Sequence, residues 1–327
     1  MRIHSGLSAA IGELLRGSLA VGNFDGVHRG HQQLFAAALR SSAARGGPAC
    51  ALTFEPHPVK LLAPQVAPPL ICSPLRKREL IAEQGIDDLV VQAFDAGFAG
   101  TEPTRFVEMI AALGVAEVVV GYDFTYGKNR KGSVESLRIG LEERGLGLQV
   151  IPPFAVNGMV VSSTKVRQLA LQGKVGAVAT LLGSPARPLD LDGEVMRGKE
   201  RGRTLGWPTA NIRTAQELLP QVGVYAVRAR VLEGARFGPP LAGAANLGLN
   251  PTFRSEGGAQ AAGESHPPLL LEVHLLDFAG DLYGRTLRVD WIERIRDERR
   301  FPDADALKAQ IARDVDDARR ILSLLKA

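Results

Sequence analysis

Two histidines, His28 and His31, lie three residues apart in the glycine-rich stretch 22–31, which reads GNFDGVHRGH. An apolar run precedes this stretch and a helix-like segment follows it, so the pattern predicts a strand, a glycine turn and a helix start. In the first turn of that helix both imidazoles would project from one face, near backbone N–H groups that have no partner inside the helix. Such amides favour an anion, and imidazoles donate hydrogen bonds to phosphate oxygens. The stretch therefore predicts a site for phosphate chemistry.

Two other interpretations of this stretch are weaker. It would be a plain turn followed by two exposed histidines, but two of the six histidines of the chain fall in this single turn. An i, i+3 histidine pair also suits zinc, yet a structural zinc site needs four ligands. Cys50 and Cys72 lie elsewhere and form no Cys-x-x-Cys motif. Gly26 and Gly30 leave room for a phosphate to approach the backbone, which again favours an anion site.

The stretch resembles the signature of the nucleotidylyltransferases related to class I aminoacyl-tRNA synthetases, in the form typical of bacterial FAD synthetases. The resemblance implies that His28 and His31 are catalytic. It also implies nucleotide contacts from the remaining signature positions, which are Gly22, Phe24, Asp25, Gly26 and Gly30.

The elements that must position these residues alternate in type through the first half of the chain. Strand-like runs occur at 19–21, 49–54, 88–94, 115–120 and 148–154, and helix-like segments at 32–44, 76–84, 104–113 and 134–143. Short apolar strands that alternate with helices predict an α/β unit, a doubly wound, Rossmann-like parallel sheet with helices on both faces. In such sheets ligands bind beyond the carboxyl ends of the strands, where the histidine motif is expected.

Two further loops follow strands of this half. His57, between two prolines after the second strand, either belongs to a strand terminator or lies in a loop near the substrate, without a chemical role. Asp123, in the stretch GYDFTYGK after the fourth strand, would accept a hydrogen bond from a flat ring or help to hold a cation. The neighbouring aromatics are either a stacking platform or core residues. The stretch resembles a motif of the same family, in which this position touches the transferred group.

A serine-rich helix start follows at residues 162–167, SSTKVR. Hydroxyls at a helix start cap free amides, or they hold a triphosphate while Arg167 neutralises the leaving pyrophosphate. The segment resembles the second nucleotide signature of the family, which implies ATP contacts from Ser163, Thr164 and Arg167. Many relatives carry a basic residue shortly before the serines, where this chain has valines at 160 and 161.

The pattern changes after a link with two prolines and a glycine at residues 182–188. We therefore expect one domain at 1–183 and a second at 184–327. The strand candidates of the second half, at 193–195, 224–232, 241–247, 269–276 and 286–291, have no helices between them, and one helix is expected at 304–325. This spacing predicts an antiparallel β-barrel with a terminal helix.

The second half carries its own phosphate motif, GKERGRTLGWPTAN at residues 198–211. Its glycines and basic residues, Gly198, Lys199, Gly202 and Arg203, would wrap a polyphosphate, although a basic surface hairpin is also a reasonable interpretation of this part. Thr209 and Asn211 offer the hard oxygen ligands that Mg²⁺ prefers. The motif is not a Walker A loop.

Glu272 lies in the middle of an apolar strand candidate, where alternation places it with His274 on one face. An isolated buried carboxylate is costly, so Glu272 is a candidate general base; a salt bridge on a solvated barrel face is an equal alternative.

These residues resemble riboflavin kinase. The resemblance implies that Thr209 and Asn211 bind Mg²⁺ and ATP, that Glu272 deprotonates the ribityl 5′-hydroxyl, and that Arg296 contacts the flavin. Together the two halves resemble the bifunctional riboflavin kinase/FMN adenylyltransferases, which implies riboflavin, FMN and ATP as substrates.

The composition fits this expectation. The 327 residues are 45% hydrophobic and 23% charged, and the net charge of +4 comes from scattered basic residues, so a nucleic-acid partner is not expected. No apolar run suits a membrane span, no export segment is indicated, and two cysteines outside any disulfide framework fit a reducing compartment; we therefore expect a cytoplasmic protein and no membrane partner. No pattern specifies an oligomeric state. The rival hypotheses are a nucleotidylyltransferase with another acceptor and a flavin-sensing or RNA-binding protein on a retained fold.

Overall fold

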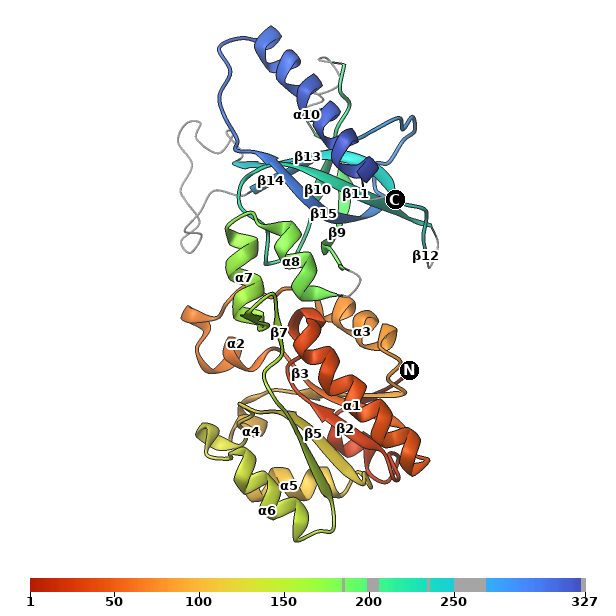
Figure 1. Ribbon diagram of the computed structural model, residues 1–327, viewed down its shortest axis with the longest axis vertical. Coiled ribbons are helices and arrows are strands. Elements are labelled where there is room, and N and C mark those ends of the chain that lie inside the picture. Colours follow the sequence, from red (N-terminus) through yellow and green to blue (C-terminus); the bar gives the residue numbers. More distant parts are fainter. Residues whose placement is uncertain (184–185, 199–205, 234–235, 250–268, 325–327) are drawn as a thin grey trace. The chain divides into compact units, whose positions relative to one another are not determined.

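The computed structural model describes residues 1–183, 186–198, 206–233, 236–249 and 269–324. The chain forms two compact units, Met1–Lys165 and Val166–Ala327, each of which is traced in Figure 1. The division falls inside helix α7 (Ser163–Leu171), earlier than the expected boundary at 183/184. Helix α8 (Val175–Leu182), which the sequence did not predict, packs on two barrel strands, and this explains the earlier division. The domain boundary itself stays a prediction.

The first unit is built on a sheet of six parallel strands, which confirms the predicted doubly wound sheet. In spatial order the strands are β1 (Arg2–Ser5), β4 (Asp88–Ala93), β3 (Ala49–Glu55), β2 (Ser18–Val21), β5 (Glu117–Gly121) and β6 (Gly147–Ile151). The α-helices are α1 (Arg29–Arg45), α2 (Pro58–Leu62), α3 (Pro74–Glu83), α4 (Ala96–Ala99), α5 (Pro103–Ala111) and α6 (Val134–Glu142). Short 3₁₀ helices are η1 (Leu7–Ala10), η2 (Asp25–Val27), η3 (Pro64–Val66) and η4 (Lys128–Arg130), and β7 (Ala155–Val156) pairs with β8 (Met159–Val160).

Both faces of this sheet are buried because each strand sends alternate side chains to opposite sides. Leu19 and Val21 of β2 pack with residues of η1, α5 and α6, whereas Ala20 between them packs with residues of α1 and α3. Figure 1 shows α1 and α3 on one side of the sheet and α5 and α6 on the other. The core of the unit is therefore two apolar layers that fix the strand ends.

Strand β2 lies between β3 and β5 in the sheet. From β2 the chain proceeds outward in one direction through β3 and β4, and later in the other direction through β5 and β6. The loops that follow β2 and β5 therefore meet at the switch point of the sheet, which is where parallel α/β sheets bind ligands.

The second unit is an antiparallel barrel, as predicted. Its described strands follow the order β12-β11-β13-β14-β10-β9-β15, and an additional β11–β15 pairing closes the barrel. The strands are β9 (Leu189–Met196), β10 (Ala210–Arg213), β11 (Gly223–Glu233), β12 (Arg236–Phe237), β13 (Leu241–Leu249), β14 (Leu269–Leu275) and β15 (Thr286–Arg296).

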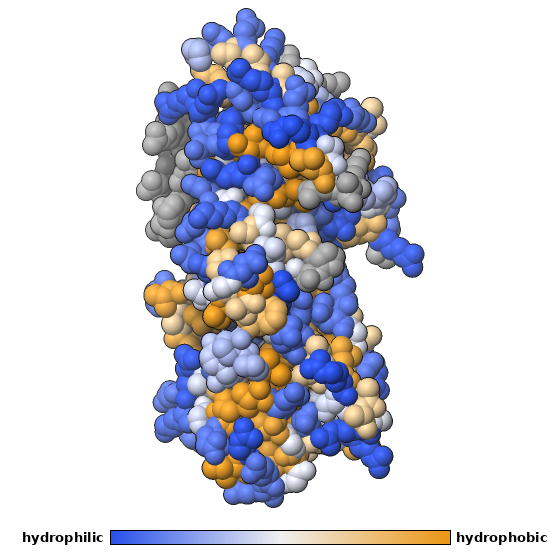
Figure 2. Space-filling view, in the orientation of Figure 1, coloured by the Kyte–Doolittle hydropathy of each residue, from blue (hydrophilic) through white to orange (hydrophobic). Residues whose placement is uncertain are grey.

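The terminal helix α10 (Ala304–Leu324) covers part of the barrel wall. Ala318 and Leu322 of α10 pack against Ala226 of β11 and Ala244 of β13. The surface around α10 that Figure 2 shows is mostly hydrophilic, so the helix has one apolar face and one solvated face.

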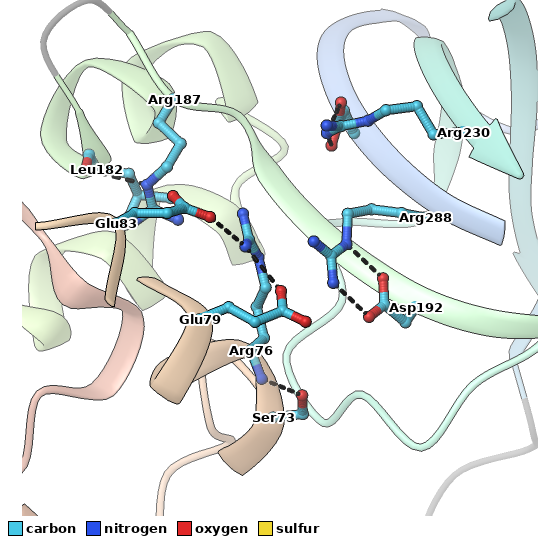
Figure 3. Close-up of polar contacts among 10 residues, drawn as sticks. Ser73, Arg76, Glu79, Glu83, Leu182, Arg187, Asp192, Arg230 and Arg288 are labelled. Carbon is cyan, nitrogen blue, oxygen red and sulfur yellow. Dashed lines mark hydrogen bonds and ion pairs between the residues drawn. The ribbon is translucent and has the colours of Figure 1, made fainter. Parts of the chain in front are cut away.

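Ion pairs hold the barrel strands in register. Arg288 of β15 binds both carboxylate oxygens of Asp192 on β9, at 2.6 and 2.7 Å (Figure 3). The Arg288 guanidinium also lies 4.4 Å from the Phe237 ring centroid. Arg230 of β11 binds Asp290 of β15 at 2.7 Å. Bidentate arginine–carboxylate pairs are among the stronger charged contacts, so they fix how these strands close the barrel.

In the first unit, α3 begins with a cap and a local ion-pair cluster. The Ser73 hydroxyl accepts a hydrogen bond from the Arg76 N–H at 3.2 Å (Figure 3). The Arg76 guanidinium binds Glu79 at 3.0 Å and Glu83 at 2.9 Å. The cap fixes the start of α3, and the ion pairs join its first turn to its last residue. Helix α3 directly follows the segment that contacts the histidine turn.

Candidate active sites

The histidine turn caps α1. The His28 Nδ1 accepts a hydrogen bond from the His31 N–H at 3.3 Å, so His28 is the N-cap residue and fixes its own ring. The two imidazoles stack, with ring centroids 3.6 Å apart and an interplanar angle of 16°. The expectation that both rings project together is met, with His28 at the cap and His31 inside the first turn.

Two glycines of the turn are required by close packing. Gly26 has a φ of +76°, and a Cβ there would lie 2.6 Å from the Ile71 side chain. A Cβ on Gly30 would lie 3.2 Å from the His28 ring and 3.4 Å from the Val161 carbonyl oxygen. The segment before α7 therefore packs directly on the start of α1, and Gly30 makes that approach possible.

Phe24 supports the site from below. Its ring is fully buried, in the core between the sheet and α1. It meets the His31 ring edge to face at 5.3 Å and tilts against Phe35 at 4.6 Å. Because the ring is covered by the core, Phe24 positions His31, and its contact with a nucleotide stays a prediction.

Asp25 holds the turn to the segment before α3. Both of its carboxylate oxygens accept a hydrogen bond from the Ile71 N–H, at 3.0 and 3.1 Å, and the Cys72 N–H lies 3.4 Å from Oδ1. In return, the Cys72 Sγ accepts a hydrogen bond from the Gly26 N–H at 3.3 Å. The side chain of Asp25 is 4% exposed, so its carboxylate serves as a clamp on the glycine turn.

The serine segment joins the same turn. The Ser163 hydroxyl donates a hydrogen bond to the Asp25 carbonyl oxygen at 3.3 Å. The neighbouring Ser162 accepts from the Lys165 N–H at 3.2 Å, so Ser162 caps the helix. Thr164 is exposed, whereas Arg167, one turn into α7, is buried. The hydrogen bond from Ser163 therefore joins the two nucleotide motifs that the sequence predicts.

Asp123 is exposed in the loop after β5, on the other side of the switch point from the histidine turn. The aromatic residues near Asp123 differ in burial. Tyr126 is a core residue whose hydroxyl contacts the Ser136 hydroxyl at 3.2 Å, and burial raises the pKa of this phenol. Tyr122 is 52% exposed and lies beside Asp123. His57 caps α2, with its Nδ1 accepting from the Val59 N–H at 3.3 Å, a structural role.

The sequence did not point to Arg29, the first residue of α1. Its guanidinium lies 5.2 Å from the centroid of the Phe154 ring. Within the described parts of the chain no carboxylate pairs with it, so a cation stands at the start of the phosphate-site helix. The position of Arg29 between the two histidines could have indicated this cation. A single arginine on a helix, however, is usually a surface residue.

The barrel aligns three polar residues on neighbouring strands. Glu272 of β14 lies directly opposite Asn211 of β10 and directly opposite Asn246 of β13. Residues opposite one another in antiparallel strands share a face, with Cβ atoms about 5 Å apart. A side chain on Gly198 would overlap the Asn211 amide, so the beginning of the phosphate motif packs on this row. Asn246 was not expected, because register across strands is not visible in the sequence.

Glu272 does not lie in the apolar interior. Leu271, Val273 and Leu275 form the buried face of β14, whereas Glu272 and His274 lie on the half-exposed outer face. The predicted alternation is confirmed. Because Glu272 is only partly buried, the cost of burying a carboxylate is not an argument for its role as a base. His274 contacts the Pro208 carbonyl oxygen through Nδ1 at 2.8 Å and so holds the segment before Thr209.

The guanidinium of Arg296 is bound to a carboxylate of α10. Its guanidinium binds both carboxylate oxygens of Asp314, at 2.8 and 2.6 Å, and donates to the Asp297 carbonyl oxygen at 2.8 Å. Gln310 also donates to Asp314, which is 4% exposed. Arg296 therefore anchors α10 to β15, and its contact with the flavin stays a prediction.

Three candidate phosphate ligands, Lys199, Gly202 and Arg203, lie outside the described residues. The described residues contain no group of three or more His, Cys, Asp or Glu side chains arranged to hold a metal ion. Thr209 and Asn211 are oxygen ligands of a different kind, which suit a cation that shares its coordination with substrate phosphates.

Comparisons with known families cover both units. The FAD synthetase family profile matches residues 13–165 and the riboflavin kinase family profile matches residues 185–322. A bifunctional riboflavin kinase/FMN adenylyltransferase of Escherichia coli (strain K12) is 38% identical over 310 residues, which is 94% of this chain and 93% of that protein. One of Bacillus subtilis (strain 168) is 33% identical over 317 residues, 96% of this chain and 95% of that protein.

A solved structure described as a macrolide-efflux protein from Streptococcus pneumoniae is similar over 97% of this chain and 98% of that one, with 29% identity and a TM-score of 0.82. Within the described residues, none of the helices of the present structure combines the length and apolar character that a membrane span requires.

A histidine turn at the switch point of a parallel sheet, joined in one chain to a barrel with its own phosphate motif, defines a transferase with two phosphate-handling sites. The chain belongs to the bifunctional riboflavin kinase/FMN adenylyltransferase family, and its two halves carry the kinase and the adenylyltransferase.

Proposed function

We propose that the barrel phosphorylates riboflavin to FMN with ATP, and that the first unit then adenylylates FMN with a second ATP to give FAD and pyrophosphate. The observation that carries this division is the position of the two polar sites. The His28–His31 pair lies at the β2/β5 switch point, and the Asn211–Glu272 pair lies on the barrel wall. Each site lies within the region that the matching family profile covers.

In the kinase reaction Glu272 takes the proton of the ribityl 5′-hydroxyl, whose oxygen then attacks the γ-phosphorus of ATP while ADP leaves. The half-exposed face of β14 gives a substrate hydroxyl access to this carboxylate. Thr209 and Asn211 would hold Mg²⁺ through oxygen ligands, and the ion would neutralise charge on the transferred phosphate. Gly198 keeps the backbone close to Asn211. Lys199, Gly202 and Arg203, which lie outside the described residues, would bind the phosphates of ATP.

In the adenylyl transfer a phosphate oxygen of FMN attacks the α-phosphorus of ATP, and pyrophosphate leaves. His28 and His31 donate hydrogen bonds to the phosphate oxygens as negative charge develops there. Ser163, Thr164 and Arg167 bind the triphosphate, and Asp123 contacts the acceptor from the opposite side of the switch point. No covalent intermediate with the enzyme is required, because positioning and charge stabilisation are sufficient for this transfer.

The test is to incubate the purified chain with riboflavin, ATP and Mg²⁺ and to separate the flavins by chromatography. The wild type should form FMN and then FAD. His28→Ala should accumulate FMN, whereas Glu272→Ala should form no FMN from riboflavin yet still convert added FMN to FAD. Glu194→Ala is a matched control for the second variant, because Glu194 is another carboxylate on a barrel strand, paired with Arg213 at 2.7 Å.

If either active-site variant lost both reactions while it remained folded, the two-site division would be wrong. If omission of Mg²⁺ left the kinase reaction intact, the metal assignment of Thr209 and Asn211 would be wrong.

The proposal also places the enzyme in the cytoplasm, where ATP is available and where two free, buried cysteines, Cys50 and Cys72, remain reduced.

A further inference from the structure

We propose that Asn246 is a positioning residue for the kinase reaction, which orients the carboxylate of Glu272 from the neighbouring strand. This inference rests on the proposed role of Glu272 as the general base. It concerns a residue outside the phosphate motif and outside the expected catalytic set.

The strand register carries the first step. Glu272 lies opposite Asn246 along a continuous run of pairs from Gly243↔Leu275 to Leu249↔Leu269, so the pairing is not an isolated contact. Directly opposed residues point to the same face, and their Cβ atoms lie about 5 Å apart. At that separation the amide of an asparagine is within reach of a glutamate carboxylate across the strand pair. The outer face of β13 therefore presents an amide to Glu272.

The second step distinguishes Asn246 from the other neighbour of Glu272. Asn211 also lies opposite Glu272, but its amide is packed against Gly198, where any side chain would overlap it. The Asn211 amide therefore packs against the phosphate motif. Asn246 belongs to a strand that contributes nothing else to the predicted metal or phosphate ligands, so its amide is available for Glu272.

The surroundings of Gly248, two residues further along β13, give the third step. A Cβ on Gly248 would overlap the Glu298 carboxylate and would lie 3.2 Å from the Asn246 Nδ2. Asn246 thus lies opposite Glu272 across the strand pair, and its amide lies near the Glu298 carboxylate beside Gly248. A neutral amide with two N–H donors suits this position, because it would donate to a carboxylate without adding charge.

Two variants of Asn246 test the proposal through the pH dependence of riboflavin phosphorylation. His274 is the titratable group on the same face of β14 as Glu272, and Glu298 is the titratable group near the Asn246 amide. Asn246→Asp keeps the shape and adds a negative charge beside Glu272, which raises the pKa of a neighbouring carboxyl group. The acidic limb of the kcat profile should move up by about one pH unit, and kcat should recover at higher pH.

Asn246→Ala removes the amide without adding charge. Its kcat should fall about tenfold, and the acidic limb should move up by less than in Asn246→Asp, because loss of a hydrogen bond to the charged form raises the pKa of a carboxyl group less than an added negative charge does. Asn157→Asp, which adds the same charge in the exposed turn between β7 and β8, is the matched control and should leave the profile unchanged. Thermal unfolding, measured on the same preparations, reports whether the barrel of each variant is folded.

A profile of Asn246→Asp that superimposes on the wild type would overturn the proposal, as would a loss of kcat in Asn246→Ala that only follows a loss of thermal stability. Glu272→Gln separates the two levels of inference. If that variant kept the kinase activity, the assignment of Glu272 as base would fail. If Glu272→Gln were inactive while Asn246→Asp showed no shift, only the positioning role of Asn246 would fail.

Discussion

Removal of the Asp25 carboxylate should abolish most of the adenylyl transfer and leave the kinase intact. Asp25→Ala removes a charged acceptor from the Ile71 N–H, at 3.0 Å, and from the more distant Cys72 N–H, at 3.4 Å. A hydrogen bond to a charged group contributes about 1.5–3 kcal/mol, and the orphaned, buried N–H groups add to the loss. We take about 3 kcal/mol as the effect on the docked turn that carries His28. Because about 1.4 kcal/mol corresponds to a tenfold change in rate, kcat/KM for FAD formation from FMN should fall about 100-fold.

The two reactions of the chain are assayed separately for this variant, with riboflavin or FMN as the flavin substrate. Asp87→Ala is the matched control, since Asp87 also accepts a backbone N–H, that of Ala49 at 2.9 Å, in the same unit but at the start of β3. Near wild-type adenylyl transfer in Asp25→Ala would refute the clamp. An equal loss in both variants would mean that general destabilisation, not the docking of the turn, is responsible.

Three further outcomes follow from the contacts. Gly198→Ala should lower riboflavin phosphorylation about tenfold or more in a kinase assay, because overpacking against the Asn211 amide costs about 1–3 kcal/mol. Arg29→Met should raise the KM for ATP in FAD formation about tenfold, and a double-mutant cycle with Phe154→Leu should be non-additive, since the ring holds the guanidinium. Burial raises the pKa of the Cys50 thiol from 9.0 to about 12; the unfolded thiol ionises first, so stability should decrease as the pH rises above about 9. Urea midpoints between pH 8 and pH 10.5 should fall less steeply for Cys50→Ala than for the wild type.

The sequence predicted the sheet and the barrel where the patterns were long and regular. Strands β2 to β6 of the first unit were found because their apolar runs alternate with helices. Strand β1 was missed because it is an exposed edge strand, in which Ile3 is 50% exposed and no run of buried residues marks it. Helix α8 was missed because its eight residues are mostly apolar and show no polar face.

The candidate sites were predictable to the extent that their chemistry lies within one short segment. His28 and His31 are three residues apart, so a single helical turn brings their rings together. Asp25 and Ile71 are 46 residues apart, and only the folded chain shows that they are bonded. Asn246 was missed for the same reason, because its position opposite Glu272 depends on the register of two strands. Long-range backbone contacts and register are therefore what the sequence could not supply.

Asp25 and Glu272 show why residue type alone does not assign a role. Both are carboxylates in motifs that the sequence analysis connected with phosphate chemistry. The oxygens of Asp25 accept a backbone N–H of a segment far away in the sequence, and the residue is buried, so its carboxylate is fixed in the contacts that hold the turn. Glu272 lies between two amide side chains on a half-exposed strand face, where a substrate hydroxyl has access to it. The first arrangement suits a fixed clamp and the second a base that gains and loses a proton. Glu272→Asp, which keeps the carboxylate but withdraws it by one methylene, should therefore lower kcat for the kinase and keep the acidic limb of its pH profile, whereas Glu272→Gln should lose the kinase activity.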